Sequence, residues 1–464
     1  MNPSTSRSNA NPMNRSIGLL LVAVLFGVLI PVRVPAQQED ALTIEQAIGI
    51  GLEKSKSLHS SSMRVQAADS RSSEVHASQL PVLRAAGSYA RLSDVPAFVA
   101  TIPKNAFGTN FPPQEVSFPL SQTILDNYGL RLTLQQPLFT GMRLQSSSDI
   151  AEYTAQATEQ DYDKDRSELV YNIKSAYWSL YKAIEFKKVI DENVEQVKAH
   201  LKDVQNLSEQ GIVTNNEVLR VEVQLSNAEL TQLSAQNNVR LASIGLSNLI
   251  GLPLASDIRP VSEIQTRKTT TARVDSLIRQ AFEARPEVKG MEYRVKVGES
   301  AVMLARSGWF PQIYLTGNYY YARPNQRIVP TVNEFRDTWD VGVSVSLDIW
   351  NWGTTIHQTN EAQAQLAEAN DALGQLKDAI QLEVTQSYLN VNESGERIGV
   401  AEKGVAQAEE NYRITNEKFK SGLALNSDLL DAEAGLLQAK WNHIQALVDH
   451  ELAQARLDRA AGGA

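Results

Sequence analysis

The chain has 464 residues, a formal net charge of −9 and no cysteine. Its length allows two or three ordinary domains. Without cysteine it has no disulfide, no thiol nucleophile and no lipid anchor on an N-terminal cysteine, and its acidic balance makes it a poor candidate for binding nucleic acid.

The first 36 residues have the pattern of a secretory signal peptide. Two arginines precede an apolar run over residues 17–30, and Ala36 ends a stretch of small residues that suits a signal peptidase. We predict cleavage after Ala36, and an uncleaved anchor is the alternative. Beyond this segment no apolar run approaches the length of a membrane-spanning helix.

The first repeat of the mature chain is predicted to cover residues 37–251. Helices are expected over 43–79 and end before Pro81, because proline biases its predecessor toward an extended backbone. Strands follow over 81–92 and 126–139. In the second of these strands apolar and polar residues alternate with a period of two, which is typical of a strand with one apolar face.

A long helical hairpin over residues 141–251 completes the first repeat. Its first helix keeps a heptad register from Leu169 to Val204 that only Lys187 interrupts, and such a register is typical of a coiled-coil seam. The return helix is about half as long as its partner. We therefore expect the helices that precede the strands to cover the rest of the long helices.

A linker is predicted over residues 252–271, and a second repeat over 272–464. The hairpins of the two repeats are related by one offset, because Gly422 follows Gly211 by 211 residues and several other pairs keep this spacing, whereas Pro311 follows Pro81 by 230 residues. The first repeat therefore has about nineteen extra residues before its hairpin. The second repeat therefore has the same order of elements, with helices over 272–308, strands over 311–322 and 337–349, and a helical hairpin over 353–462.

The two hairpin turns share a pattern of a glycine, capping residues and an acid. Glycine suits a left-handed helix end, polar side chains cap the next helix, and an acid in its first turn suits the helix dipole. In chain order these residues are Gly211, Thr214, Asn215 and Glu217 in the first turn, and Gly422, Asn426 and Asp428 in the second. We interpret each turn as the tip of a long hairpin.

The four strands have the length and alternation of strands that cross a lipid bilayer, and no other segment reads as a strand. Four strands cannot close a barrel, and an open edge in lipid would leave amides unpaired. Sister copies would have to complete the barrel, and three copies would supply twelve strands. The polar side chains that would then line the lumen are Arg131, Thr133, Gln135, Asp340 and Ser344. The alternative is the solvent face of a soluble β-sandwich.

The order of these elements resembles the TolC-like outer-membrane efflux proteins over the whole mature chain. The likeness depends on the duplication, on the paired Gly-x-x-x-Asn-x-acid-x-Leu tips and on the sequence Pro-Leu-Phe-Thr-Gly at residues 137–141, with a looser copy at 348–353. It implies a mainly α-helical fold with a membrane β-barrel. In this fold a homotrimer forms a 12-stranded β-barrel that continues into a 12-helix α-barrel, with the linker 252–271 in the equatorial region.

The resemblance also implies a function and partners. Proteins of this family are exit ducts in the cell outer membrane for tripartite efflux or type I secretion systems, with the helical barrel in the periplasm. They passively conduct substrates delivered by a periplasmic adaptor (membrane fusion) protein and an inner-membrane pump, and no cofactor is implied. The residues that match the family's adaptor-docking tips are Gln210, Gly211, Ile212, Ser421, Gly422 and Leu423.

Three acids match the family's narrow periplasmic gate, namely Asp428, Asp431 and Glu217. Two aspartates per chain would place six carboxylates around one axis, and such a ring favours cations. The alternative for Asp428 is a first-turn acid that only suits the helix dipole. The family's closed mouth can be held by an arginine and by the hydroxyl of an aromatic side chain. At these two positions this chain has Ala424, which carries no charge, and Phe419, which has no hydroxyl. We therefore expect a looser or differently latched entrance.

Two other functions remain open from the residues alone. One is a soluble periplasmic coiled-coil scaffold or adaptor in which the strands form a small sheet. The other is a phage receptor or adhesin that would use the loops 93–126 and 323–337. The six histidines lack the HExxH spacing of a zinc protease and no phosphate-binding loop is present, so neither an enzyme nor a metal site is predicted.

Overall fold

The computed structural model describes residues 40–96, 99–119, 124–262, 264 and 273–463. The predicted signal peptide and its cleavage at Ala36 lie outside the described residues, as do residues 263 and 265–271 of the predicted linker. In the part of the chain that is described, none of the helices combines the length and the apolar character that a membrane span requires.

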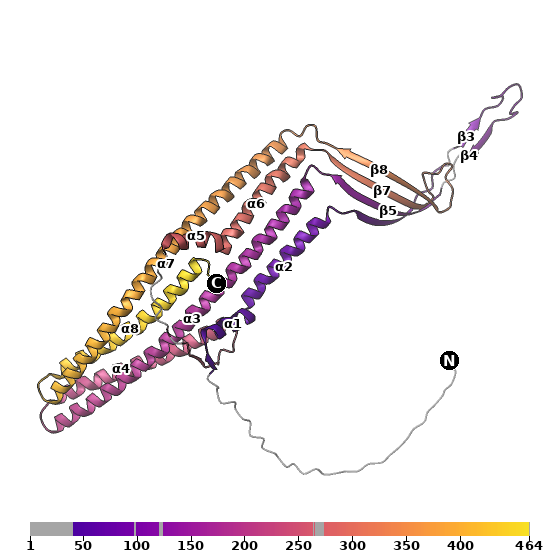
Figure 1. The fold of residues 1–464 in the computed structure, drawn as a ribbon. Helices are drawn as coiled ribbons and strands as arrows, with labels where there is room; N and C mark the ends of the chain where they lie inside the picture. Colours follow the sequence, from indigo (N-terminus) through magenta and orange to yellow (C-terminus); the bar gives the residue numbers. More distant parts are fainter. Residues whose placement is uncertain (1–39, 97–98, 120–123, 263, 265–272, 464) are drawn as a thin grey trace, which may run out of the picture. The chain divides into compact units, whose positions relative to one another are not determined.

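Each repeat contains two short helices, two strands of one sheet and a long helical hairpin (Figure 1). The elements of the first repeat are α1 (Ile44–Lys54), α2 (Lys56–Ala77), β2 (Val82–Arg91), β5 (Asp126–Phe139), α3 (Arg143–Glu209) and α4 (Asn215–Leu249). Those of the second are α5 (Val274–Ala284), α6 (Pro286–Arg306), β7 (Gln312–Arg323), β8 (Arg336–Ser346), α7 (Thr354–Lys420) and α8 (Asn426–Ala460). A 3₁₀ turn, η1 (Ser307–Trp309), follows α6.

The four long strands form one antiparallel sheet in the order β2-β5-β7-β8 (Figure 1). In its register Thr133 lies opposite Asn318, and Asn318 lies opposite Asp340. Since side chains of paired residues point to the same side of a sheet, these three share one face. Within the described residues, β2 and β8 are the end strands of the sheet.

Shorter strands are also present, so the expectation of only four strands is wrong. β1 (Asp40–Leu42) pairs in parallel with β6 (Ile258–Pro260), and β3 (Val99–Ile102) pairs with β4 (Val116–Pro119) in an antiparallel ribbon. Three or four residues are too few to show an alternating pattern, which is why the sequence did not reveal them. Neither pair joins the four-stranded sheet.

The predicted strand 337–349 is also shorter in the structure, where β8 ends at Ser346. The physical reason is the register, because Ser346 pairs with Gln312 and β7 begins at that residue. Beyond Ser346 the apolar and polar residues continue to alternate in the sequence without a pairing partner on β7.

Within each repeat, shorter helices cover the long helix along its length (Figure 1). α3 packs against α4 and α2, α7 packs against α8 and α6, and α3 also packs against α6 and α8 of the second repeat. Where α4 ends, Gly251 has a φ of 73° and lies against Lys54, and where α8 ends, Gly462 has a φ of 82° and lies against Ala284. A left-handed backbone beside a close neighbour favours glycine, so each return helix stops where a short helix pair turns.

A single buried hydroxyl joins the middle of α3 to two distant segments. Tyr177 is fully buried, and its hydroxyl donates to the carbonyl of Leu42 at 2.9 Å. The same oxygen accepts hydrogen bonds from the N–H groups of Val261 and Ser262, at 3.1 and 2.9 Å. The N-terminal strand and the described part of the linker are therefore held together on α3.

Candidate functional site

Both hairpin turns close in the same way. Gly211 and Gly422 have φ values of 71° and 72°, in the left-handed region that favours glycine. The N–H of the next residue donates to the carbonyl five residues earlier, at 2.9 Å for Ile212 and 2.8 Å for Leu423. This is the Schellman pattern, which satisfies carbonyls that a helix end would otherwise leave free.

The six residues expected to dock an adaptor are all exposed at these two turns. They are Gln210, Gly211, Ile212, Ser421, Gly422 and Leu423. The apolar side chains of Ile212 and Leu423 are 63% and 79% exposed. Around the two glycines, a Cβ atom would meet nothing within 4 Å in the described chain. Each tip thus presents an exposed apolar side chain beside a glycine that no other part of the described chain covers.

The helices after the turns are not capped as predicted. The side chain of Thr214 makes no capping hydrogen bond, and Asn215 and Asn426 are already the first residues of α4 and α8. Asp428 accepts a hydrogen bond from the N–H of Leu425 at 3.0 Å. This carboxylate satisfies one of the free donors at the start of its own helix.

Asn426 instead joins the two hairpins. Its side-chain amide donates to Oε2 of Glu217 at 2.7 Å, and the Asn426 side chain is buried. Arg220, one turn along the same helix as Glu217, lies 3.8 Å from this carboxylate. A neutral amide therefore holds Glu217 between the hairpins, and the nearby arginine belongs to the same helix as the acid.

The other two predicted gate residues, Asp428 and Asp431, are exposed on α8. Residues three positions apart lie on one face of a helix, so the two carboxylates are neighbours there. In the described part of the chain, no hydrogen bond or ion pair joins either aspartate to Glu217. The structure thus brings Glu217 to Asn426 and leaves the aspartates facing outward from the single chain.

Behind the tips lies a buried pair of ionisable residues that sequence reasoning missed. The side chains of His200 on α3 and Glu433 on α8 are each 2% exposed, and their nearest atoms are 3.3 Å apart, although the geometry is too poor for a hydrogen bond. Phe419 packs edge-on against His200, with ring centroids 5.2 Å apart. Burial raises the pKa of Tyr412 nearby, and the carboxylate of Glu433 raises it further. The repeat concealed this pair, because the equivalent of Glu433 is the exposed Glu222.

The predicted lumen residues share the polar face of the sheet, and three of them belong to one hydrogen-bond network. Arg131 and Thr133 donate to Oδ1 of Asn318 at 2.8 and 3.0 Å. The amide of Asn318 donates to Asp340 at 2.8 Å. The other two predicted residues lie further along the same face and are Gln135 and Ser344. Sequence reasoning missed the central Asn318, because its neighbours depend on the register of three strands.

The opposite face of the sheet is apolar and exposed. On β8 its side chains are between 60% and 71% exposed, and they are Trp339, Val341, Val343 and Val345. Monomeric soluble proteins rarely expose a continuous apolar surface of this kind. The sheet therefore has one face suited to water and one suited to lipid.

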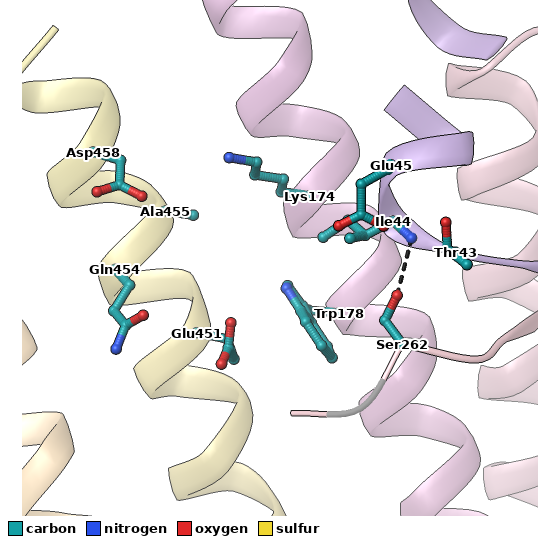
Figure 2. A pocket seen from close by; sticks show the side chains of 10 residues that line it. All are labelled: Thr43, Ile44, Glu45, Lys174, Trp178, Ser262, Glu451, Gln454, Ala455 and Asp458. Carbon is teal, nitrogen blue, oxygen red and sulfur yellow. Dashed lines mark hydrogen bonds between the residues drawn. The ribbon is translucent and has the colours of Figure 1, made fainter. Parts of the chain in front are cut away.

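A cavity of about 450 Å³ near α1, α3 and α8 was not predicted (Figure 2). Figure 2 shows Lys174 of α3 on one side and Glu451 and Asp458 of α8 on the other. The N–H of Ile44 donates to the hydroxyl of Ser262 at its edge, at 3.0 Å. Over the described ranges, no group of three histidine or acidic side chains is arranged to hold a metal ion.

Comparison with known proteins points to one family. The model for the outer membrane efflux protein family matches residues 47–252 and 277–463. Over 344 residues the chain is 25% identical to the alkaline protease secretion protein AprF of Pseudomonas aeruginosa, covering 73% of this chain and 70% of that protein. Over 321 residues it is 22% identical to the outer membrane protein TolC of Vibrio cholerae, covering 68% of this chain and 72% of that protein.

A solved structure shows the same fold. The outer-membrane channel OprN is 19% identical and superposes with a TM-score of 0.74. The superposition covers 91% of this chain and 90% of that one. The likeness therefore extends over both repeats, including the sheet and the long helices.

Proposed function

The chain belongs to the outer membrane efflux protein family, and we propose that three copies of it form the exit duct of a tripartite efflux or type I secretion system. It is a channel of the outer membrane and not an enzyme. Substrates reach it from a periplasmic adaptor and an inner-membrane pump and cross passively. The sheet crosses the membrane, and the long helices extend into the periplasm.

The four-stranded sheet carries this proposal. It has one polar face, one exposed apolar face and two end strands, β2 and β8. In lipid every backbone amide must be paired, so both end strands need partners. Joining β8 of one copy to β2 of the next closes a barrel, and three sheets of four strands make a barrel of twelve.

Two helices of the single chain, α4 and α7, each have a side that no neighbouring helix covers. α3 packs against α4 and α8, and α8 packs against α7, which leaves α4 and α7 at the two sides of the row. Both carry apolar side chains that are more than half exposed in the single chain. They are Leu219, Val223, Leu230 and Leu233 on α4, and Leu382, Leu389 and Val400 on α7. Packing of α7 against α4 of the next copy would cover both stripes and give a barrel of twelve helices.

The tips form the periplasmic entrance in this assembly. Asp428 and Asp431 from three copies place six carboxylates around the axis, and such a ring favours cations. Glu217 and Asn426 hold neighbouring hairpins together at the same level. The exposed tip residues, including Ile212 and Leu423, form the docking surface for the adaptor, and residues 252–262 of the linker lie in the equatorial region.

The polar face of the sheet lines the lumen, with Arg131, Thr133, Gln135, Asp340 and Ser344 in contact with water. The soluble scaffold considered from the sequence does not fit a sheet with an exposed apolar face.

Cleavage of the signal peptide after Ala36 precedes assembly in the outer membrane. Energy for transport comes from the pump, because the family to which this chain belongs is not enzymatic.

The first experiment measures assembly and conduction. The protein is extracted from outer membranes in detergent, its mass is determined, and it is added to planar lipid bilayers. A trimer that produces single-channel currents is the expected result. A monomer recovered in the soluble periplasmic fraction would contradict the proposal.

The second experiment tests adaptor docking. Because the chain has no cysteine, Ile212→Cys or Leu423→Cys introduces a single site for a thiol-specific cross-linker in living cells. We expect a periplasmic adaptor, identified by mass spectrometry, to be captured at either tip. The matched control is Glu368→Cys, which is exposed on α7 far from the tip. Equal capture from both positions would count against tip docking.

A further inference from the structure

The first residues of the segment between β7 and β8, residues 324–335, fold back over the polar face of the sheet, whereas Phe335 at its end stacks on Tyr321 on the opposite face. Asn325 is buried, and its side-chain amide donates to the carbonyl of Arg336 and to the hydroxyl of Thr338, at 3.1 and 3.2 Å. A cavity of about 350 Å³ separates the first residues of the segment from the strands. The strand residues on the polar face that line it are Ser88, Ala90, Asn127, Gly129, Tyr320 and Ala322.

Arg327 fastens this segment to the lumen network. Its guanidinium donates to Oδ2 of Asp340 at 2.6 Å and lies 4.7 Å from the centre of the Tyr320 ring. Arg131 lies near the same ring, with its Cζ 5.2 Å from the centre. Asp340 also accepts from Asn318, which accepts from Arg131. Two guanidinium groups thus adjoin one aromatic ring and share one hydrogen-bond network.

The polar face carries an excess of positive charge. Its strand positions and the segment that covers them supply three cations, Arg84, Arg131 and Arg327, against the single carboxylate of Asp340. Arg336 at the start of β8 is paired with Glu334 at 2.9 Å, so these two charges balance. A ring of arginines in a water-filled pore attracts anions and repels cations.

We propose that Arg327 makes the segment 324–335 a cationic constriction at the outer end of the lumen, which favours anionic over cationic solutes. This inference rests on the proposed trimeric channel, in which three copies of Arg327 and Arg131 surround one axis. The exposed ion pair and the stacking contact are individually weak. The Arg327 side chain can therefore leave the lumen when a large solute passes and return afterwards, while the hydrogen bonds of the buried Asn325 keep the start of the segment on β8.

The test measures access from outside the cell to a single cysteine below the constriction. Ser344→Cys lies on the polar face of β8, beyond Asp340 from the segment, and the chain has no other cysteine. Intact cells receive either an anionic or a cationic methanethiosulfonate reagent of similar size. The ratio of the two labelling rates reports charge selection on the route to this cysteine, and its dependence on Arg327 assigns that selection to the outer end.

We expect Arg327→Ala, in the Ser344→Cys background, to lower the anionic-to-cationic ratio roughly threefold, as when the difference between the screened interaction energies of the two reagents falls by about RT. Asp340→Asn keeps the arginine but removes the carboxylate that opposes its charge, so the anionic-to-cationic ratio should rise. The matched control is Arg91→Ala, which removes an arginine on the opposite face of the same sheet and leaves the ratio unchanged. Recovery of trimers on gels checks that each variant assembles.

The outcomes separate the two proposals. A cysteine at position 344 that neither reagent reaches from outside would contradict the proposed channel itself. If the cysteine is labelled but the ratio is the same with and without Arg327, the channel stands and the constriction is wrong. A change in the ratio for Arg91→Ala equal to that for Arg327→Ala would also overturn it.

Discussion

The side-chain amide of Asn426 donates to the carboxylate of Glu217 at 2.7 Å and so ties the tip of one helical hairpin to the other. The two residues occupy non-equivalent places in the duplicated units, because Asn426 corresponds to Asn215 and Glu217 corresponds to Asp428. A second contact of the same kind, between Asn215 and Asp428, is thus available by symmetry. Within the chain Asp428 is instead bonded to the N–H of Leu425.

We predict that Asn426→Ala loosens the periplasmic entrance. A hydrogen bond to a charged group contributes about 1.5–3 kcal/mol, and its loss removes a direct tie between the hairpins. Single-channel conductance of the trimer should rise relative to the wild type. Asn216→Ala is the control, because this exposed residue lies at the same tip and takes part in no hydrogen bond between the hairpins in the described chain. Unchanged conductance in Asn426→Ala would show that the entrance is held elsewhere.

We also predict that Asn215 lies near Asp428 of the neighbouring protomer. In a ring of six hairpins, each hairpin has one neighbour in its own chain and one in the next chain. The contact between Glu217 and Asn426 within a chain therefore recurs between chains as a contact between Asp428 and Asn215. A double variant with Asn215→Cys and Asp428→Cys should yield covalent dimers and trimers with a short bifunctional thiol reagent. The pair Glu217→Cys and Asn426→Cys should instead cross-link within one chain. If both cysteine pairs gave only intrachain products, the predicted contact between protomers would be wrong.

The buried pair of His200 and Glu433 should be costly to break. Truncating a fully buried side chain leaves a cavity in the packing between α3 and α8, and such truncations typically cost about 2–5 kcal/mol. Glu433→Ala should therefore lower the temperature at which the trimer dissociates on gels. Glu222→Ala, at the equivalent exposed position, should change stability by no more than about 0.5 kcal/mol. Similar losses from both variants would contradict the role assigned to burial.

The joint between α5 and α6 should weaken in acid. Arg285 is buried and lies 3.0 Å from Glu287 and 2.6 Å from Glu383. Burial is the largest single influence on Glu287 and raises its pKa, but the hydrogen bond from Arg285, a backbone hydrogen bond and the positive charges of Arg285 and Lys164 together outweigh it and hold the pKa below its ordinary value of 4.5. Because the folded-state pKa is the lower one, this stabilisation is complete above that value and is lost as the pH falls through the folded-state pKa.

The measurement is thermal stability as a function of pH. The wild type should lose stability below pH 4.5, and Glu287→Gln should show a shallower decline because that titration is gone. Glu283→Gln, on the exposed side of α5, serves as the control and should follow the wild type. If the wild type and Glu287→Gln lost thermal stability identically as the pH falls, the titration of Glu287 would not contribute to the acid sensitivity of the protein.

Local sequence patterns were sufficient to predict most of the helices and strands. The alternation over 126–139 coincides with β5, and the heptad positions from Leu169 to Val204 form much of the buried side of α3. Lys187, the exception in that register, is only half-buried and pairs with Asp191 at 2.6 Å. Such signals are readable because helix and strand periods repeat along the chain itself.

The sequence by itself therefore determined the duplicated order of helices and strands, the glycine turns at Gly211 and Gly422, and the family to which the chain belongs. Only the tertiary structure decided that Asn318 lies between Arg131 and Asp340, that Glu433 is buried while Glu222 is exposed, and that Arg327 reaches back into the sheet. Periodicity and turn chemistry are local properties of a chain. The contacts of these side chains depend on strand register and on packing between segments far apart in sequence, which no local pattern encodes.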